Sequence, residues 1–308
     1  MARRGVDLGR SMSEAPAPRE QSGRAPSPSP LISPEALLAR LGDPDLRIVD
    51  ARWYLGRPGA GRAAYEAGHL PGAIHLDLDE DLSAPQGPGR HPLPDPAAFA
   101  RRMGDAGIGS RQTVVGYDDQ GGWVAASLWW MLERLGHRHV FVLDGGLRAW
   151  TDAGGRLTTE VPARSPARLE VDGGWTGTID RDALRQRLGQ VVVLDARAAA
   201  RYRGEVEPID PAAGHVPTAI SAPFEANLGP DGRFLPPDAL ARRFRELGAD
   251  GARLVVTYCG SGTSALHHAL AMRLAGLPDP TLYVGSWSDW SRAGYPVATG
   301  PEPGGLPR

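Results

Sequence analysis

Residues 192–197 read Val-Val-Leu-Asp-Ala-Arg, and residues 47–52 read Arg-Ile-Val-Asp-Ala-Arg. Each segment is a short, apolar run rich in β-branched residues that ends in Asp-Ala-Arg, which is typical of a strand buried inside a parallel sheet. The segment that starts at residue 192 begins 145 residues after the one that starts at residue 47, a period too long for a solenoid repeat. The pattern predicts a duplicated domain.

Three further pairs of segments repeat in the same order. They are a turn before a short strand (67–74 and 213–220), a strand that ends in a small-residue loop (113–118 and 254–259), and a strand followed by a tryptophan-containing segment (141–150 and 282–290). Strands that alternate with helical segments predict two α/β domains, each with a mainly parallel sheet flanked by helices.

These repeats predict five parts along the chain. They are a disordered tail rich in Pro, Arg and Ser (1–30), an N-terminal domain (31–154), a linker (155–177), a C-terminal domain (178–300) and a short tail (301–308). The first part lacks the apolar core of a signal peptide.

Composition excludes several classes of function. The formal net charge is -2, with 34 basic and 36 acidic residues, so nothing favours a nucleic-acid or membrane partner. No apolar run approaches the roughly 20 residues of a membrane-spanning helix. A single cysteine excludes an intramolecular disulfide and a multi-thiolate metal site, and it favours a reducing compartment. We therefore expect a cytoplasmic location.

That cysteine, Cys259, ends an apolar strand and precedes a loop and a helix. The loop residues are Gly260, Ser261, Gly262, Thr263, Ser264 and Ala265. Two glycines allow the backbone to curl so that its N–H groups point inward, and the helix N-terminus adds positive potential. A thiolate held there is an available nucleophile. A free cysteine is often only a small buried hydrophobic residue, but the end of a parallel strand favours a ligand site.

The chain resembles the tandem-domain rhodanese sulfurtransferases over about residues 31–300. The loop 259–265, Cys-Gly-Ser-Gly-Thr-Ser-Ala, is similar to that of the 3-mercaptopyruvate branch and lacks the Arg and Lys usual in the thiosulfate-using branch. The segments 213–220 and 204–210 also match the family. The resemblance implies two rhodanese-like domains and a sulfurtransferase.

The mechanism implied by the resemblance is a double displacement. The Cys259 thiolate takes sulfur from a small donor, with 3-mercaptopyruvate favoured and thiosulfate as the alternative. An external acceptor, either a small thiol, a thioredoxin-like protein or cyanide, then removes the sulfur from the persulfide. Loop residues 260–265 would hold the persulfide without a metal or other cofactor. The N-terminal copy would be silent, because Asp118 stands where the second copy has Cys259.

The resemblance also assigns three substrate-binding residues. Arg201 matches an arginine that grips the donor's anionic group, and Ser261 matches a serine that forms a relay with a histidine, for which His69 is the match. Each also has a structural explanation, as a solvated arginine, a loop residue and a turn residue. A second arginine expected nine positions after Arg201 is Asp210 here. No acidic partner is evident upstream of His69, so we expect no complete triad.

Two other functions are compatible with the scaffold. A cysteine phosphatase needs an arginine six positions after its cysteine, where this chain has Ala265. A non-enzymatic sulfur carrier would need no donor pocket, and the presence of Arg201 argues against it. Sulfurtransfer is therefore the prediction.

Overall fold

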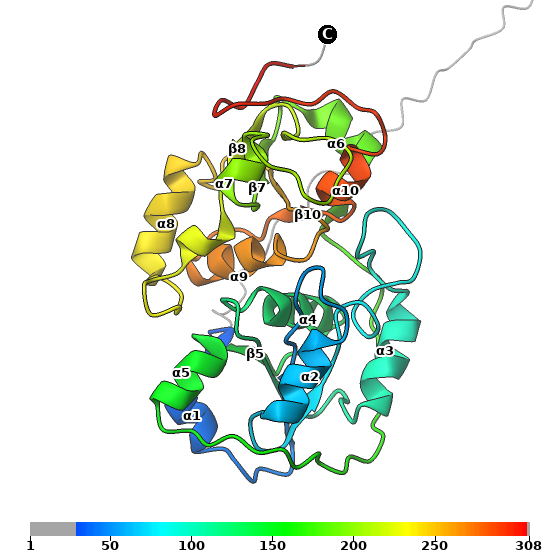
Figure 1. Ribbon diagram of the computed structural model, residues 1–308, viewed down its shortest axis with the longest axis vertical. Helices are drawn as coiled ribbons and strands as arrows, with labels where there is room; N and C mark the ends of the chain where they lie inside the picture. Colours follow the sequence, from blue (N-terminus) through cyan, green and yellow to red (C-terminus); the bar gives the residue numbers. More distant parts are fainter. Residues whose placement is uncertain (1–28, 307–308) are drawn as a thin grey trace, which may run out of the picture.

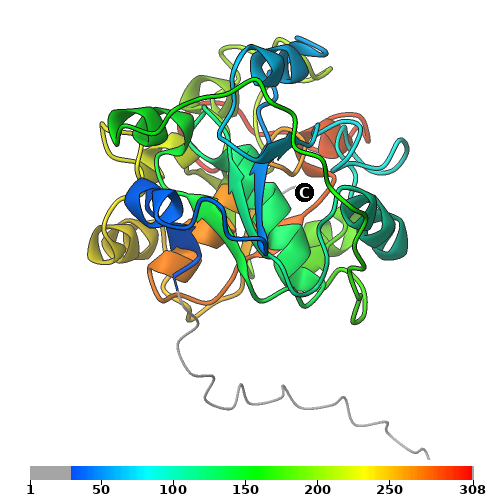
Figure 2. The same ribbon diagram turned by 90° about the horizontal axis from the view of Figure 1, so that it is seen from below.

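The computed structural model describes residues 29–306 as two α/β domains that lie one above the other (Figure 1). Helices surround the sheet of the N-terminal domain when it is viewed from below (Figure 2). Nearly all of the predicted N-terminal tail, and residues 307–308 of the predicted C-terminal tail, lie outside the described residues.

The N-terminal sheet has five parallel strands in the order β1-β5-β4-β2-β3. The strands are β1 (Leu31–Ile32), β2 (Leu46–Asp50), β3 (Ala73–His75), β4 (Thr113–Tyr117) and β5 (Val140–Leu143). The helices are α1 (Pro34–Leu38), α2 (Ala60–Ala67), α3 (Pro96–Asp105), α4 (Trp123–Arg134) and α5 (Gly146–Asp152). The central strand β4 is almost completely buried, because helices cover both faces of the sheet.

The C-terminal sheet repeats this topology in the order β6-β10-β9-β7-β8. The strands are β6 (Thr178–Ile179), β7 (Val192–Asp195), β8 (Ala219–Ser221), β9 (Val255–Tyr258) and β10 (Thr281–Tyr283). The helices are α6 (Arg181–Arg187), α7 (Ala199–Tyr202), the 3₁₀ helix η1 (Phe224–Asn227), α8 (Pro237–Glu246), α9 (Leu266–Leu274) and α10 (Ser286–Trp290). Two α/β domains with parallel sheets are thus confirmed.

The repeated Asp-Ala-Arg motif forms a buried ion pair in each domain. Arg52 Nη2 lies 2.6 Å from Asp50 Oδ2 and donates a second hydrogen bond of 2.7 Å to the Gly68 carbonyl. Arg197 makes the same bonds to Asp195 and to the equivalent glycine. A buried charge is tolerated when it is paired and hydrogen-bonded. The motif therefore joins the end of a central strand to the following Gly-His turn.

The segment predicted as a linker packs along the N-terminal domain. Thr158 pairs with His69 in an isolated bridge, Ala167 N–H donates to the Gly104 carbonyl, and Trp175 Nε1 donates to the Pro94 carbonyl. These hydrogen bonds hold an extended segment on a folded surface. The chain therefore enters the C-terminal domain from a defined position.

The domains meet where α4 packs against α9 (Figure 1). Residues 124–132 of α4 and 266–272 of α9 are buried around the whole helix, as expected for helices enclosed on every side. One apolar cluster contains residues of both, including Leu128, Leu266 and Leu270, and extends to Cys259. The position of the cysteine is therefore coupled to the contact between the domains.

Two fully buried histidines lie on α9. His267 Nε2 is 3.0 Å from the Gly121 carbonyl of the other domain, and His268 Nδ1 is 2.9 Å from Thr257 Oγ1. Burial, which disfavours the charged ring, lowers the pKa of each to about 3. Both are therefore neutral in the folded protein above that pH.

These histidines make stability depend on pH. Above pH 6.5 neither the folded nor the unfolded state protonates them, whereas between pH 6.5 and about 3 the unfolded chain binds protons that the folded chain excludes. The free energy of unfolding should therefore decrease as the pH is lowered through this range, by about 1.4 kcal/mol per pH unit for each histidine. The free energy of unfolding can be measured by urea unfolding at several pH values between pH 7 and pH 5. Its slope against pH should be shallower in His268→Met than in the wild type, by about the amount expected for one histidine. Equal slopes would contradict a buried neutral His268.

Candidate active site

Cys259 follows β9 and is 1% exposed. Its N–H donates to Ser286 Oγ at 3.1 Å, and its carbonyl accepts from Trp287 N–H at 3.0 Å. The next carbonyl, of Gly260, accepts from Ser288 N–H at 2.9 Å. The start of α10 therefore holds the backbone on either side of the thiol.

The loop after Cys259 turns an N–H group toward its sulfur. Gly262 N–H donates to Cys259 Sγ at 3.1 Å. Gly262 has a φ of +94°, and a β-carbon there would lie 2.6 Å from the Val284 carbonyl oxygen, so only glycine fits. In the part of the chain that the structure describes, the N–H groups of Thr263 and Ala265 have no protein acceptor. The loop can therefore accommodate an anion beyond the thiol sulfur.

The N-terminal domain shows what such a loop binds. Asp118 occupies the position of Cys259, and its buried carboxylate accepts hydrogen bonds from four backbone N–H groups, those of Gln120, Gly122, Val124 and Ala125. Burial raises the pKa of Asp118, while these hydrogen bonds oppose the rise. The first copy thus fills its own loop with a side-chain acceptor. In the second copy, Cys259 replaces this carboxylate, and one loop N–H, that of Gly262, contacts its sulfur.

Ser261 belongs to a chain of three polar side chains. Its Oγ lies 2.7 Å from His91 Nδ1, and His91 Nε2 lies 2.9 Å from Asp79 Oδ1. The hydrogen bond from His91, supported by one from Trp53 Nε1, lowers the pKa of Asp79. Because a carboxylate only accepts, we assign the His91 proton to Nε2, so that Nδ1 accepts from the Ser261 hydroxyl.

The prediction that paired His69 with Ser261 was wrong. His69 is fully buried, stacks on Tyr65 at 3.8 Å, and places its ring nitrogens 2.8 Å from the Tyr65 carbonyl and 3.1 Å from that of Glu160. His215 stacks on a tyrosine in the same way in the second domain. Because both domains contain the same histidine–tyrosine stack, we interpret His69 as a residue that stabilises its turn. The expected absence of a triad was also wrong, since Asp79 completes one.

Arg201 lies in α7, within an ion-pair cluster. Its Nη2 is 2.7 Å from Glu207 Oε1 and 3.3 Å from Asp210 Oδ2. Asp210 also pairs with Arg90 of the N-terminal domain. The sequence analysis missed Arg90 and His91. They lie on one loop, Gly89-Arg90-His91, which has a counterpart in Gly232-Arg233-Phe234; this repeat was the available signal.

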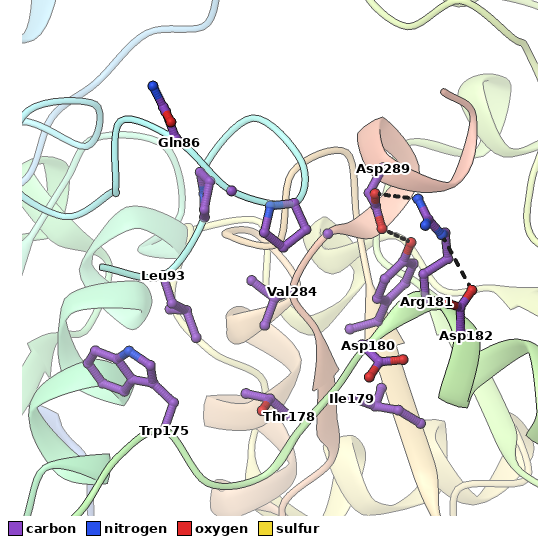
Figure 3. Close-up of a pocket in the computed structure, with 15 residues that line it drawn as sticks. Gln86, Leu93, Trp175, Thr178, Ile179, Asp180, Arg181, Asp182, Val284 and Asp289 are labelled. Atoms are coloured by element: carbon purple, nitrogen blue, oxygen red, sulfur yellow. Dashed lines mark hydrogen bonds and ion pairs between the residues drawn. The ribbon is translucent and has the colours of Figure 1, made fainter. Parts of the chain in front are cut away.

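One cavity of the described residues lies apart from this cluster. It has a volume of about 400 Å³ and is lined by Trp175, Leu93 and Val284 on one side and by an Arg181–Asp289 ion pair of 3.0 Å on the other (Figure 3). Asp289 also accepts from Tyr283 Oη. Arg181, Asp289 and Tyr283 are thus paired with one another, and Cys259 does not line the cavity. Among residues 29–306, no group of three His, Cys, Asp or Glu side chains is placed to hold a metal ion.

Comparison with known proteins gives consistent matches. The family model described as "Rhodanese-like domain" matches residues 33–153 and 180–293. A probable 3-mercaptopyruvate sulfurtransferase of Pseudomonas aeruginosa is 47% identical over 89% of this chain and 99% of that protein. A putative thiosulfate sulfurtransferase of Mycobacterium tuberculosis is 40% identical over 82% of this chain and 90% of its own. The crystal structure of SseA from Escherichia coli superposes with a TM-score of 0.75 at 28% identity, covering 84% and 99% of the two chains.

Ser286, whose hydroxyl accepts a hydrogen bond from the Cys259 N–H, has a strained backbone conformation, and the effect of this strain on stability can be tested. Ser286 has a φ of +54°, where its counterpart in the first domain is Gly146, with a φ of +57°. Ser286→Ala should lose about 1–3 kcal/mol of unfolding free energy, because the buried Cys259 N–H loses its acceptor. Ser286→Gly should lose less, by about 1 kcal/mol, because glycine adopts this φ without strain. Urea unfolding measures both. A loss in Ser286→Gly equal to or larger than that in Ser286→Ala would contradict the strain at this position.

Proposed function

Since the chain belongs to the rhodanese family of sulfurtransferases, we propose that it transfers sulfur from 3-mercaptopyruvate through a persulfide on Cys259. One observation carries this proposal. Gly262 N–H contacts the sulfur while the amides of Thr263 and Ala265 have no acceptor within residues 29–306, and the homologous loop around Asp118 binds a carboxylate. The outer sulfur of a persulfide anion would accept hydrogen bonds from these amide N–H groups.

The chemistry proceeds in two steps. The Cys259 thiolate attacks the thiol sulfur of the donor and forms the S–S bond. The C–S bond breaks, and its electron pair goes to the carbon that becomes the methyl carbon of pyruvate. The thiol proton ends on that carbon, so atoms and charge balance. In the second step an acceptor thiolate or cyanide attacks the outer sulfur and releases the Cys259 thiolate.

Ser261, His91 and Asp79 would handle the proton. The Ser261 hydroxyl is hydrogen-bonded to His91 Nδ1, and His91 is held by Asp79. The hydroxyl can therefore accept the proton of the donor's thiol while it passes its own proton to His91. The reverse transfer, from His91 through the hydroxyl, then delivers a proton to the carbon that becomes the methyl carbon of pyruvate. The catalytically silent domain thereby contributes the base, since Asp79 and His91 both belong to it.

The donor assignment rests on the residues next to the thiol. The loop 259–265 has no basic side chain, and Arg201 would bind the carboxylate of a keto acid. Thiosulfate remains the second candidate, because a relative named as a putative thiosulfate sulfurtransferase is 40% identical. Cys259 is the chain's single cysteine, so the persulfide must pass to an external thiol or to cyanide. We also place the protein in the cytoplasm, whose reducing conditions suit a free catalytic thiol.

The proposal is tested by steady-state kinetics on one preparation with cyanide as acceptor. We expect kcat/KM to be higher for 3-mercaptopyruvate than for thiosulfate. Cys259→Ser should abolish turnover and the added sulfur mass that exposure to donor produces in the wild type. A preference for thiosulfate would reverse the donor assignment, and residual turnover in Cys259→Ser would refute the nucleophile.

The relay is tested by comparing two histidines. His91→Gln should lower kcat for 3-mercaptopyruvate by about 100-fold, as expected for loss of a general base. His69→Phe should lower the free energy of unfolding, because buried polar contacts are lost, while kcat stays near that of the wild type. If His69→Phe abolished turnover and His91→Gln did not, the relay assigned here would be wrong.

A further inference from the structure

Trp53 divides the two oxygens of the Asp79 carboxylate. Trp53 Nε1–H donates to Oδ2 at 2.7 Å, while Oδ1 lies 2.9 Å from His91 Nε2. The Asp79 side chain is 52% exposed, whereas that of His91 is 7% exposed. A half-exposed carboxylate with one partner can rotate and turn its oxygens toward water. The indole N–H restricts this rotation, so that Oδ1 stays directed at His91.

The indole is itself held on both sides and at its backbone. Its ring is 8% exposed and stands nearly perpendicular to those of His91, at 5.2 Å between centroids, and of Trp123, at 5.9 Å. Both arrangements are favourable edge-to-face contacts. The Trp53 carbonyl accepts a hydrogen bond of 2.6 Å from Gln120 Nε2. The donor to Asp79 therefore has a fixed position.

Gln120 belongs to the loop that contains Asp118. Its N–H donates to Asp118 Oδ1 at 2.9 Å. Because Asp118 and Cys259 occupy equivalent positions, Gln120 is the counterpart of Ser261, two residues further along each loop. A chain of contacts thus joins equivalent positions of the two loops. In order, its members are Gln120, Trp53, Asp79, His91 and Ser261.

The two domains differ at the position of Trp53. Trp53 follows the Asp-Ala-Arg motif at 50–52, whereas Ala198 follows the motif at 195–197. The ion pair of the motif forms in both domains. This part of the fold therefore does not require an indole at the next position. The hydrogen bond to Asp79 is a reason for the tryptophan in the N-terminal copy.

We propose that Trp53 and Gln120 are positioning residues of the sulfur transfer, in which Gln120 fixes Trp53 and Trp53 holds Asp79 with one oxygen directed at His91. The inference rests on the proposed function, because the relay is part of it. Neither residue exchanges a proton with the donor. The loop around Asp118 thereby contributes to the reaction at Cys259, because it anchors the support of the base.

A double-mutant cycle on kcat for 3-mercaptopyruvate, with cyanide as acceptor, tests the inference. Trp53→Phe keeps an aromatic ring but lacks the N–H, so kcat should fall by about 10-fold while KM stays within about 2-fold of the wild type. In an Asp79→Ala background Trp53→Phe should lower kcat no further, because residues that act as a unit are not additive. Losses that multiply would show that Trp53 acts through packing alone, and would overturn the inference.

Two further variants separate positioning from stability. Trp150→Phe, in the same domain, removes an indole N–H that donates to the Arg156 carbonyl at 3.1 Å. It should lower the free energy of unfolding in urea and leave kcat near that of the wild type. Gln120→Ala changes a half-buried side chain and should lower kcat by about 3-fold, again with no further loss in the Asp79→Ala background. It decides the question if Trp53→Phe does not fold.

Failure of this inference is distinct from failure of the proposed function. Absence of turnover with either donor in the wild type would refute the proposed function. Wild-type kcat in both Trp53→Phe and Gln120→Ala would overturn the inference alone. An equal loss of kcat in Trp150→Phe and Trp53→Phe would also overturn it, because removal of any indole N–H would then have the same effect.

Discussion

The packing of α4 against α9 decides which residues meet at Cys259. Because both helices are buried around their circumference, the two domains are held at one relative position, and each can extend a loop onto the other. The loop with Arg90 and His91 reaches the Cys259 site. Its counterpart with Phe234 reaches the N-terminal domain, where Phe234 N–H donates to Asp144. The candidate active site is therefore a product of the domain contact.

The function of each copy follows from where the copies differ. His91 contacts Ser261 of the loop after Cys259, whereas the equivalent Phe234 packs within the domain contact and stacks on His267 at 4.4 Å. Ser286 supplies a hydroxyl to the Cys259 N–H, whereas Gly146 approaches the Asp118 carbonyl so closely that a β-carbon would lie 2.2 Å away. Polar groups are thus present on one side of the duplication, and packing groups replace them on the other.

Much of the fold could be predicted because its signals are local. Apolar runs, glycine loops and the repeat itself define two parallel sheets, and a strand–loop–helix pattern locates Cys259 at the end of β9. Local sequence patterns could not identify the residue that contacts Ser261. His91 lies 170 residues away in sequence, and periodicity does not say how two domains are oriented. His69 was the wrong choice because it belongs to a turn that both copies share. A comparison of Gly-Arg-His at 89–91 with Gly-Arg-Phe at 232–234 would have indicated His91.

The two anion-binding loops differ in what completes them, and this bears on stability. Asp118 fills its loop with a carboxylate that belongs to the chain and accepts hydrogen bonds from four N–H groups. In the catalytic loop a single N–H contacts the Cys259 sulfur. Unsatisfied buried N–H groups cost free energy, so the catalytic loop is less stable by itself than the silent one. On the proposed mechanism the transferred sulfur supplies the missing acceptor, and the loop is most stable when it carries the persulfide.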